Sequence, residues 1–478
     1  MIPIAKDKPT RDSVFDHRSL KEIYSEIQKV YLSDKRPWVI GFSGGKDSTA
    51  CVQLIWYALS ELPPEKRDKP IYVISSDTLV ESPILTSYIY SIHKKIIEEA
   101  QRQNMPFRAE IVTPTIQDTF WVLLLGKGYP APQTMFRWCT DRMKIKPADQ
   151  FILSKVNQFG EVILVLGVRK EESNTRAQVM SLYKIKDSLL SRHSRFPQAF
   201  VYTPVEDFTV DDVWTYLLQK RSPWGANNRE LLSLYSSRNS GECPLVVDKT
   251  TPSCGGGRFG CWTCTVVTKD KSMETLVEDG ERWLKPLLEI RDYLHMTTDP
   301  DKKAEFRDYK GMNGKIRIKN DGSGEIARGP YKLSFCKELL RKLLEAQKFI
   351  EKEKPGTDFK VIRPEELHAI RKLWMTEKGD WEDSLPKIYR EVMGEDLDWV
   401  QDDAGSFSAS ENALLGKICN EHQIPMQLVV KLLDVERQIQ GMTRRSSAYA
   451  RIDAVLQEEW RSEEDVLKAS DGNKLAST

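Results

Sequence analysis

The stretch Gly41-Phe-Ser-Gly-Gly-Lys-Asp-Ser-Thr49 decides the fold, because it joins two apolar segments of different length. Residues 38–41 have the pattern of a short buried strand, and residues 50–59 are apolar enough to form a packed helix. A glycine-rich turn at the positive end of a helix directs several backbone N–H groups to one point, which makes an anion site. The hydroxyls and the lysine within the turn would add donors and charge. The stretch therefore predicts a phosphate-binding strand–loop–helix unit.

The spacing within this loop excludes a Walker A motif. Asp47 follows Lys46 where that motif needs Ser or Thr, and the span from Gly41 to Gly45 is one residue short. Residues 43–48 instead resemble the pyrophosphate loop of the ATP pyrophosphatase superfamily, whose members cut ATP between the α and β phosphates. The alternative is a loop that only turns a strand into a helix. The resemblance implies ATP binding by the following residues: Ser43, Gly44, Gly45, Lys46, Asp47 and Ser48.

Length and composition fit an ordinary globular protein. The chain has 478 residues, 40% of them hydrophobic, and a net charge of +1, so two or three domains are expected and any nucleic-acid surface must be local. No apolar run reaches the roughly 18 residues of a membrane span, and the N-terminus lacks a signal-peptide core. We therefore expect a cytoplasmic protein without a membrane partner.

Apolar strands alternate with helices along the first part of the chain. Strands are predicted at residues 70–77, 109–113 and 162–167, with an amphipathic helix at residues 83–103. Apolar strands separated by helices indicate an α/β fold with a parallel sheet covered on both faces. Ligands of such sheets bind beyond the carboxyl ends of the strands. The loop at residues 43–48, the acid after the second strand and the segment after the fourth should therefore meet in one crevice.

Two acids and two arginines are candidates for that crevice. Asp47 is the better Mg²⁺ ligand because the loop places it beside the phosphates, while Asp77 could bind nucleotide or simply cap the next helix. The segment containing Arg169 and Arg176 resembles the Gly-x-Arg-x-x-Glu-Ser-x-x-Arg segment of the PAPS reductase branch of the superfamily. Both guanidinium groups could hold phosphate or sulfate oxygens, and the alternative is a solvated helix face.

The eight cysteines are unevenly distributed. In a cytoplasmic chain they favour metal binding or catalysis over disulfides. Four of them fall within 22 residues with only one Cys-x2-Cys pair, a spacing that favours a [4Fe–4S] cluster over zinc. The predicted ligands are Cys243, Cys254, Cys261 and Cys264.

Cys139 lies in a different setting, among basic residues. Cationic neighbours lower the pKa of a thiol, as a sulfur carrier or nucleophile would require. A phosphate-binding loop in which the thiol is incidental, or an additional cluster ligand, are the alternatives. The basic side chains assigned to phosphate or substrate binding are Arg137, Arg142 and Lys144.

Taken together, five segments resemble the DndC family, the sulfurtransferases of bacterial DNA phosphorothioation. The resemblance covers roughly residues 15–395, and the Glu-Cys-Gly-x-His tail of true PAPS reductases is missing. It implies ATP- and Mg²⁺-dependent activation of a DNA phosphate, catalysis by Lys46, Asp47 and Cys139, sulfur from a cysteine desulfurase, and DndD- and DndE-type partner subunits. The segments are residues 43–49, 76–83, 126–132, 136–140 and 252–264.

The rest of the chain is basic and then helical. Residues 302–332 hold nine basic side chains against four acidic ones, which makes them a candidate DNA contact or a solvated insertion. The expected division is an N-terminal helical segment (1–35), the ATP pyrophosphatase domain (36–240), the iron–sulfur region with the basic insertion (241–332), a helical domain (333–400) and a helical C-terminal unit with a polar tail (401–478).

Two other functions stay open. A phosphoadenylyl-sulfate or adenylyl-sulfate reductase would use a thiol reductant and release sulfite. A subunit that binds ATP without catalysis, within a DNA-modification or restriction complex, would not need Cys139.

Overall fold

The computed structural model describes residues 12–172, 178, 181–186, 188–236, 260–319, 325–380, 382–399, 409–439 and 448–466. Two compact units share the chain. The first consists of residues 1–115, 137–264 and 269–280, and the second of residues 116–136, 265–268 and 281–478. The five-part division expected from the sequence stays a prediction.

The first unit is built on a six-stranded sheet in the order β3-β2-β1-β4-β6-β5. Its strands are β1 (Trp38–Gly41), β2 (Ile71–Ser76), β3 (Phe107–Val112), β4 (Val162–Val165), β5 (Ser191–Arg192) and β6 (Ala199–Tyr202). All neighbouring strands are parallel except the edge pair β5–β6. The predicted α/β class with a parallel sheet is therefore confirmed.

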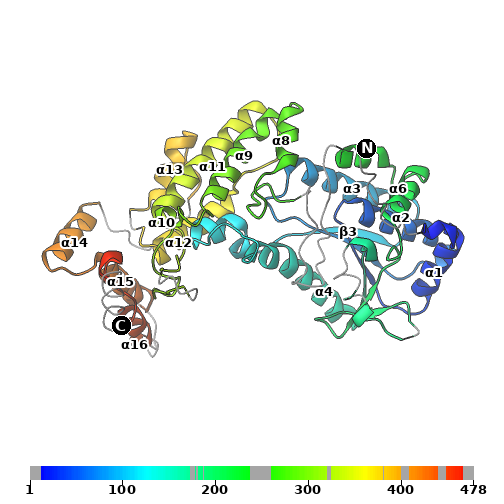
Figure 1. Ribbon diagram of the computed structural model, residues 1–478, viewed down its shortest axis with the longest axis horizontal. Helices are drawn as coiled ribbons and strands as arrows, with labels where there is room; N and C mark the ends of the chain where they lie inside the picture. Colours follow the sequence, from blue (N-terminus) through cyan, green and yellow to red (C-terminus); the bar gives the residue numbers. More distant parts are fainter. Residues whose placement is uncertain are drawn as a thin grey trace, which may run out of the picture. The chain divides into compact units, whose positions relative to one another are not determined.

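Helices cover both faces of this sheet (Figure 1). Side chains alternate along the strands: Trp38 and Ile40 pack with α1, α2, α3 and α6, whereas Val39 packs with Ile152 of α4 on the opposite face. The helices are α1 (Leu20–Leu32), α2 (Lys46–Ser60), α3 (Pro83–Arg102), α4 (Lys146–Phe159), α6 (Val210–Gln219), α7 (Asn228–Ser236) and α8 (Lys271–Glu278). Short 3-10 turns are η1 (Val14–Asp16), η2 (Pro64–Lys66) and η6 (Lys170–Glu172), and η5 (Thr140–Ile145) is π-helical.

The sheet order places a topological switch point between β1 and β4. The chain leaves β1 toward β2 on one side and later returns to form β4 on the other. In open parallel sheets the crevice outside the carboxyl ends of such a strand pair is the usual ligand site. The loop after β1 and the segment after β4 both begin at this point.

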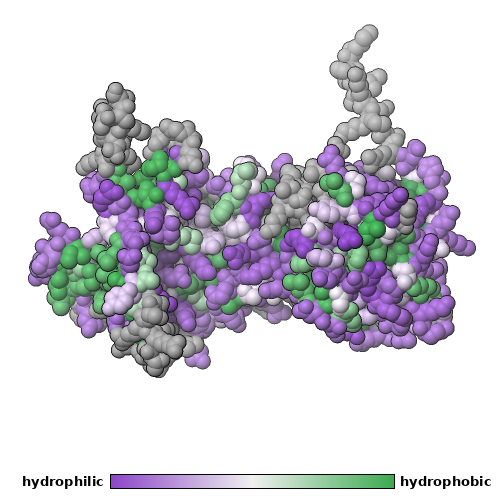
Figure 2. Space-filling view, turned by 90° about the horizontal axis from the view of Figure 1, so that it is seen from below, coloured by the Kyte–Doolittle hydropathy of each residue, from purple (hydrophilic) through white to green (hydrophobic). Residues whose placement is uncertain are grey.

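The second unit is helical in its described ranges, with a few isolated bridges. Its helices are α9 (Lys285–Met296), α10 (Lys303–Phe306), α11 (Leu333–Glu353), α12 (Pro364–Glu377), α13 (Ser384–Met393), α14 (Ala409–Glu421), α15 (Met426–Ile439) and α16 (Ala448–Leu456), with short turns η3 (Ile116–Asp118), η4 (Val122–Gly126, π-helical) and η7 (Arg282–Leu284). Hydrophobic side chains lie on the surface over α14, where Leu414 and Ile418 are exposed (Figure 2).

Two indole hydrogen bonds tie this unit together. Trp121 donates to the Val361 carbonyl at 2.8 Å, and Trp374 donates to the Leu125 carbonyl at 2.7 Å. Both rings are fully buried, so each N–H needs the partner it has. None of the described helices combines the length and apolar character that crossing a bilayer requires.

Candidate functional site

The loop after β1 is built as an anion cradle. Gly44 has φ +72°, a conformation that glycine adopts without strain, and Gly45 begins α2 without a side-chain cap. The Ser43 hydroxyl accepts the Gly45 N–H at 3.3 Å and contacts the Ser48 hydroxyl at 3.1 Å, so the serines hold the loop's own shape. The result is an uncapped helix N-terminus at the carboxyl end of β1, where backbone N–H groups favour an anion.

One buried hydroxyl beside the cradle also lacks a partner. Thr49 is 3% exposed, and its Oγ1 has no hydrogen bond within the described part of the chain. A buried polar atom of this kind is costly unless a ligand or water satisfies it. The donor set of the loop therefore fits the phosphates of a nucleotide.

Asp47 joins two positive side chains of the crevice. Its Oδ2 lies 2.8 Å from Lys46 Nζ, and its Oδ1 lies 2.6 Å from Arg169 Nε. Arg169 is 3% exposed and also donates to Glu171 at 3.0 Å. The structure thus brings the three predicted residues together, with the arginine paired to carboxylates. A carboxylate is the ligand type that Mg²⁺ prefers, and a metal here would replace one of the two cations.

Gly167 allows Asp47 and Arg169 to approach each other, a role that was not predicted from the sequence. A Cβ at this position would lie 2.8 Å from the Asp47 carbonyl oxygen and 2.9 Å from Ser48 Cα. Only glycine lets the segment after β4 approach the first turn of α2 this closely. A glycine directly after an apolar strand was the available signal.

Asp77 lies at the end of β2 and organises its own turn. Its Oδ1 accepts the Leu79 N–H at 2.7 Å, and its Oδ2 accepts the Tyr90 hydroxyl at 3.1 Å. The N-terminal cap of α3 is Ser82, so the interpretation of Asp77 as the cap of that helix is wrong. Its nucleotide-binding role stays a prediction.

Three cysteines of the first unit lie near one another. Cys139 directly precedes the π-helical turn η5, and the Cys264 N–H donates to the Cys261 carbonyl at 3.0 Å. Burial raises the pKa of Cys139 to about 11, and the Cys264 thiol acts in the same direction. Burial also raises the pKa of Cys261, with Cys139 contributing. The expected low pKa of Cys139 is therefore wrong, because burial outweighs Lys144 and Arg137, which lower it.

Glu81 connects this thiol group to a lysine. Its Oε1 lies 3.1 Å from Lys144 Nζ, 3.0 Å from Thr78 Oγ1 and 3.5 Å from Cys261 Sγ. An isolated antiparallel bridge pairs Glu81 with Cys261 across 180 positions of sequence. This contact was not predicted from the sequence, and Lys144, which was predicted to bind phosphate, is paired with a carboxylate.

The structure gives fewer contacts for the other predicted site residues. Arg137 and Arg142 flank Cys139, with the Arg137 carbonyl accepting the Thr140 N–H at 3.1 Å. Across the described ranges, no group of three or more His, Cys, Asp or Glu side chains has the arrangement of a metal site. The remaining predicted residues, Cys243, Cys254 and Arg176, lie outside the described residues.

Comparison with known families separates two regions of the chain. Residues 37–266 match the phosphoadenosine phosphosulfate reductase domain. Residues 410–457, which span most of α14 to α16, match a domain described as a small protein found in certain Dnd DNA modification systems. Together with the sheet order, the first match gives residues 37–266 an adenine nucleotide alpha hydrolase-like fold of the PAPS reductase type.

Individual relatives are distant. An uncharacterized protein of Methanocaldococcus jannaschii is 24% identical over 56% of this chain and 44% of its own length, so the chain spans less than half of that relative. PAPS reductase of Candida auris is 14% identical, covering 48% of this chain and 89% of that one, with a TM-score of 0.29. The U34-tRNA thiolase of Methanococcus maripaludis, solved with its [4Fe–4S] cluster, is 11% identical over 58% and 80% of the two chains, with a TM-score of 0.28.

Proposed function

We propose that the protein is an ATP-dependent sulfurtransferase that replaces a non-bridging oxygen of the DNA backbone with sulfur. The observation that carries this proposal is the presence, in one chain, of a PAPS reductase-type domain and a Dnd-associated domain. The first supports a nucleotide-binding role, and the second supports a role in DNA modification.

The crevice is suited to activating a phosphate with ATP. The cradle of residues 43–48 would hold the β and γ phosphates at the N-terminus of α2, with Lys46 neutralising charge on the leaving pyrophosphate. Asp47 would hold Mg²⁺. An oxygen of the DNA phosphodiester then attacks the α phosphorus, pyrophosphate leaves, and the backbone carries AMP as a leaving group. Without that step an oxide-like group would have to leave unaided.

Sulfur enters in the second half of the reaction. A persulfide supplied by a cysteine desulfurase displaces AMP, and a thiol then cleaves the remaining S–S bond, giving the phosphorothioate and a disulfide. Cys243, Cys254, Cys261 and Cys264 are the proposed ligands of a [4Fe–4S] cluster, which takes four thiolates. Cys139, whose thiol lies with those of Cys261 and Cys264, is the proposed sulfur carrier, and the alternative is that it replaces one of the four ligands. When bound, such a cluster supplies iron that can hold sulfur. Zinc is the alternative metal.

The proposal extends to partners and location. A Dnd-associated domain at residues 410–457 supports an assembly with other Dnd proteins, for which DndD- and DndE-type subunits are the expected ones. The substrate is DNA, and the protein would act in the cytoplasm.

A second candidate is a sulfonucleotide reductase, favoured by the PAPS reductase domain match taken alone. It would need PAPS or adenylyl sulfate with a thiol reductant, and it would release sulfite rather than pyrophosphate. Its substrate does not include DNA, which separates the two candidates in one assay.

The test uses full-length protein purified without oxygen, with ATP, DNA and a persulfide donor. Pyrophosphate release is measured, and phosphorothioate dinucleotides are detected by mass spectrometry after nuclease digestion. Asp47→Asn should lower pyrophosphate release at least about tenfold while bound iron is unchanged, because one electrostatic interaction at developing charge is worth that much or more. The matched control is Asp211→Asn, at an exposed acid of α6. Sulfite from PAPS without DNA-dependent pyrophosphate would contradict the proposal.

A further inference from the structure

Lysines from two segments of the second unit lie near one tryptophan, and a third lysine interacts with one of them. Lys310 of the basic insertion lies 4.5 Å from the centre of the Trp460 ring, and Lys431 of α15 lies 5.6 Å from it. Burial lowers the pKa of Lys378, after the end of α12, and Lys431 adds to that effect. The basic insertion and the Dnd-associated domain therefore contribute to one positive surface.

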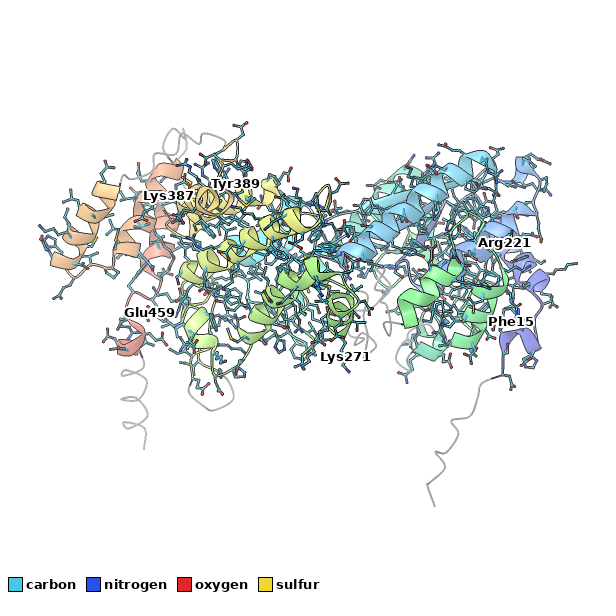
Figure 3. All side chains as sticks on the ribbon, turned by 90° about the horizontal axis from the view of Figure 1, so that it is seen from above. Phe15, Arg221, Lys271, Lys387, Tyr389 and Glu459 are labelled. Carbon is cyan, nitrogen blue, oxygen red and sulfur yellow. The ribbon has the colours of Figure 1, made fainter. Side chains whose placement is uncertain are left out.

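The segment directly after that domain lies on this surface. Glu458 pairs with Lys431 at 2.7 Å, and Glu463 pairs with Arg328 of the insertion at 2.6 Å. Two further contacts come from the backbone of the segment: the Glu459 N–H donates to the Gly314 carbonyl at 3.0 Å, and the Arg461 carbonyl accepts the Tyr309 hydroxyl at 2.8 Å. Glu459 is labelled on this segment in Figure 3. We call residues 458–463 the acidic clip.

Three other cations of the insertion have partners within it. Arg307 donates to the carbonyls of Gly329 and Arg328, Lys319 pairs with Glu325, and Lys332 donates to the Ala304 carbonyl at 2.8 Å. These three cations are therefore less suited to contact DNA. Arg328 stands out, because its Nη1 is buried without a hydrogen-bond partner among the described residues, although its Nη2 holds Glu463.

We propose that the acidic clip occupies a binding site for the DNA backbone formed by Lys310, Arg328 and Lys431, and that DNA displaces it. This inference rests on DNA being the substrate, as proposed above. It adds the location at which the DNA backbone binds and the segment that occupies this location when DNA is absent. The clip presents carboxylates to the cations that phosphates would contact, so it acts as an internal competitor.

The balance of the two interactions favours displacement by a polyanion. Each pair of the clip joins a more accessible side chain (Lys431 40%, Glu463 33%) to a less accessible one (Glu458 13%, Arg328 19%). Solvent reaches both pairs and screens them, so they oppose a competitor only modestly. Each phosphate contact releases a condensed counterion, which at 0.1 M salt is worth roughly eight-fold in affinity. A short acidic peptide has no condensed counterions to release, so DNA is the favoured occupant.

The test measures binding of fluorescent duplex DNA to the full chain by anisotropy over a range of salt. Glu463→Gln should tighten binding about five- to ten-fold at 0.1 M salt and steepen the log–log salt dependence by about 0.9, because it frees one cation. Glu289→Gln, at an exposed acid of α9, removes the same charge and should change affinity less than about two-fold. Adding Arg328→Gln to Glu463→Gln should reverse the gain.

A charge-neutral variant makes the test independent of net charge. A Cβ at Gly314 would collide with the Glu458 side chain, so Gly314→Ala should release the clip and also tighten DNA binding. Equal gains from Glu463→Gln and Glu289→Gln, no gain from either clip variant, or equal binding of polyglutamate and DNA would overturn the inference. These measurements do not involve pyrophosphate release. The inference about the acidic clip can therefore be wrong while the proposed reaction is correct.

Discussion

Replacing Gly167 with alanine tests whether the site depends on the close approach of two backbone segments. The new Cβ would lie 2.8 Å from the Asp47 carbonyl oxygen and 2.9 Å from the Asp47 carbonyl carbon, whereas ordinary contacts begin at 3.4 Å. Both opposing atoms belong to the backbone of α2, so no flexible side chain can yield. The first turn of α2 must move by about half an ångström, and overpacking of this kind costs about 1–3 kcal/mol.

The substitution should lower the rate of pyrophosphate release by more than the loss of folding stability alone suggests. A misplacement of about 1 Å at reacting groups can cost about a hundred-fold in rate, so half of that distance should lower pyrophosphate release about tenfold. Pyrophosphate release at saturating ATP and urea unfolding are measured on the same preparation. The control is Gly416→Ala in α14, where the nearest atom to the new Cβ is Met426 Sδ at 3.7 Å, and helix propensity predicts a gain of about 0.5–1 kcal/mol. Wild-type activity in folded Gly167→Ala would refute the reasoning.

Two further predictions concern a buried histidine and a buried thiol. Burial lowers the pKa of His93, whose Nε2 lies 2.7 Å from Ser75 Oγ, from 6.5 to about 4. The unfolded chain binds this proton more tightly, so the contribution of His93 to the free energy of unfolding should be constant above pH 6.5 and fall by on the order of 3 kcal/mol as pH drops toward 4. In urea titrations His93→Gln should remove this part of the pH dependence and leave the part due to His193, whose pKa burial also lowers to about 4; identical pH profiles for both proteins would contradict this. Cys139→Ser should keep the bound iron measured after anaerobic purification but lose sulfur transfer, whereas Cys419→Ala, at a buried cysteine of α14, should keep both; loss of most of the iron would make Cys139 a cluster ligand instead.

The fold was largely predictable because local pattern and topology agree. An apolar strand, a Gly-Gly turn and an apolar helix have few other arrangements, and β1 and α2 form where residues 38–59 predicted them. The helical domain expected from residue 333 likewise begins with α11, in which Leu339 and Leu343 are fully buried. The edge strand β5 was not predicted because two residues carry too little periodicity, and its neighbour β6 was not predicted either.

The thiol site could be predicted only in outline, because its contacts are distant in sequence. The basic residues around Cys139 are visible in the sequence, but the burial that outweighs their effect on its pKa is not. Likewise, nothing near Glu81 indicates that Cys261 returns to pair with it after 180 positions. Composition around a residue predicts its charge environment only when the residue is exposed.

The ion pairs of Asp47 define the arrangement of charges in the crevice before ATP and Mg²⁺ bind in the proposed reaction. With Lys46 and Arg169 on its two oxygens, the carboxylate neutralises cations that would otherwise face each other in the crevice. If Asp47 takes Mg²⁺, the metal brings more positive charge than one displaced cation removes, and we expect Lys46, on a more flexible stem than Arg169, to be the cation that moves. Lys46 would then reach the phosphates only after metal and nucleotide arrive together. Arg169, held by Glu171 as well, would keep Asp47 in place throughout.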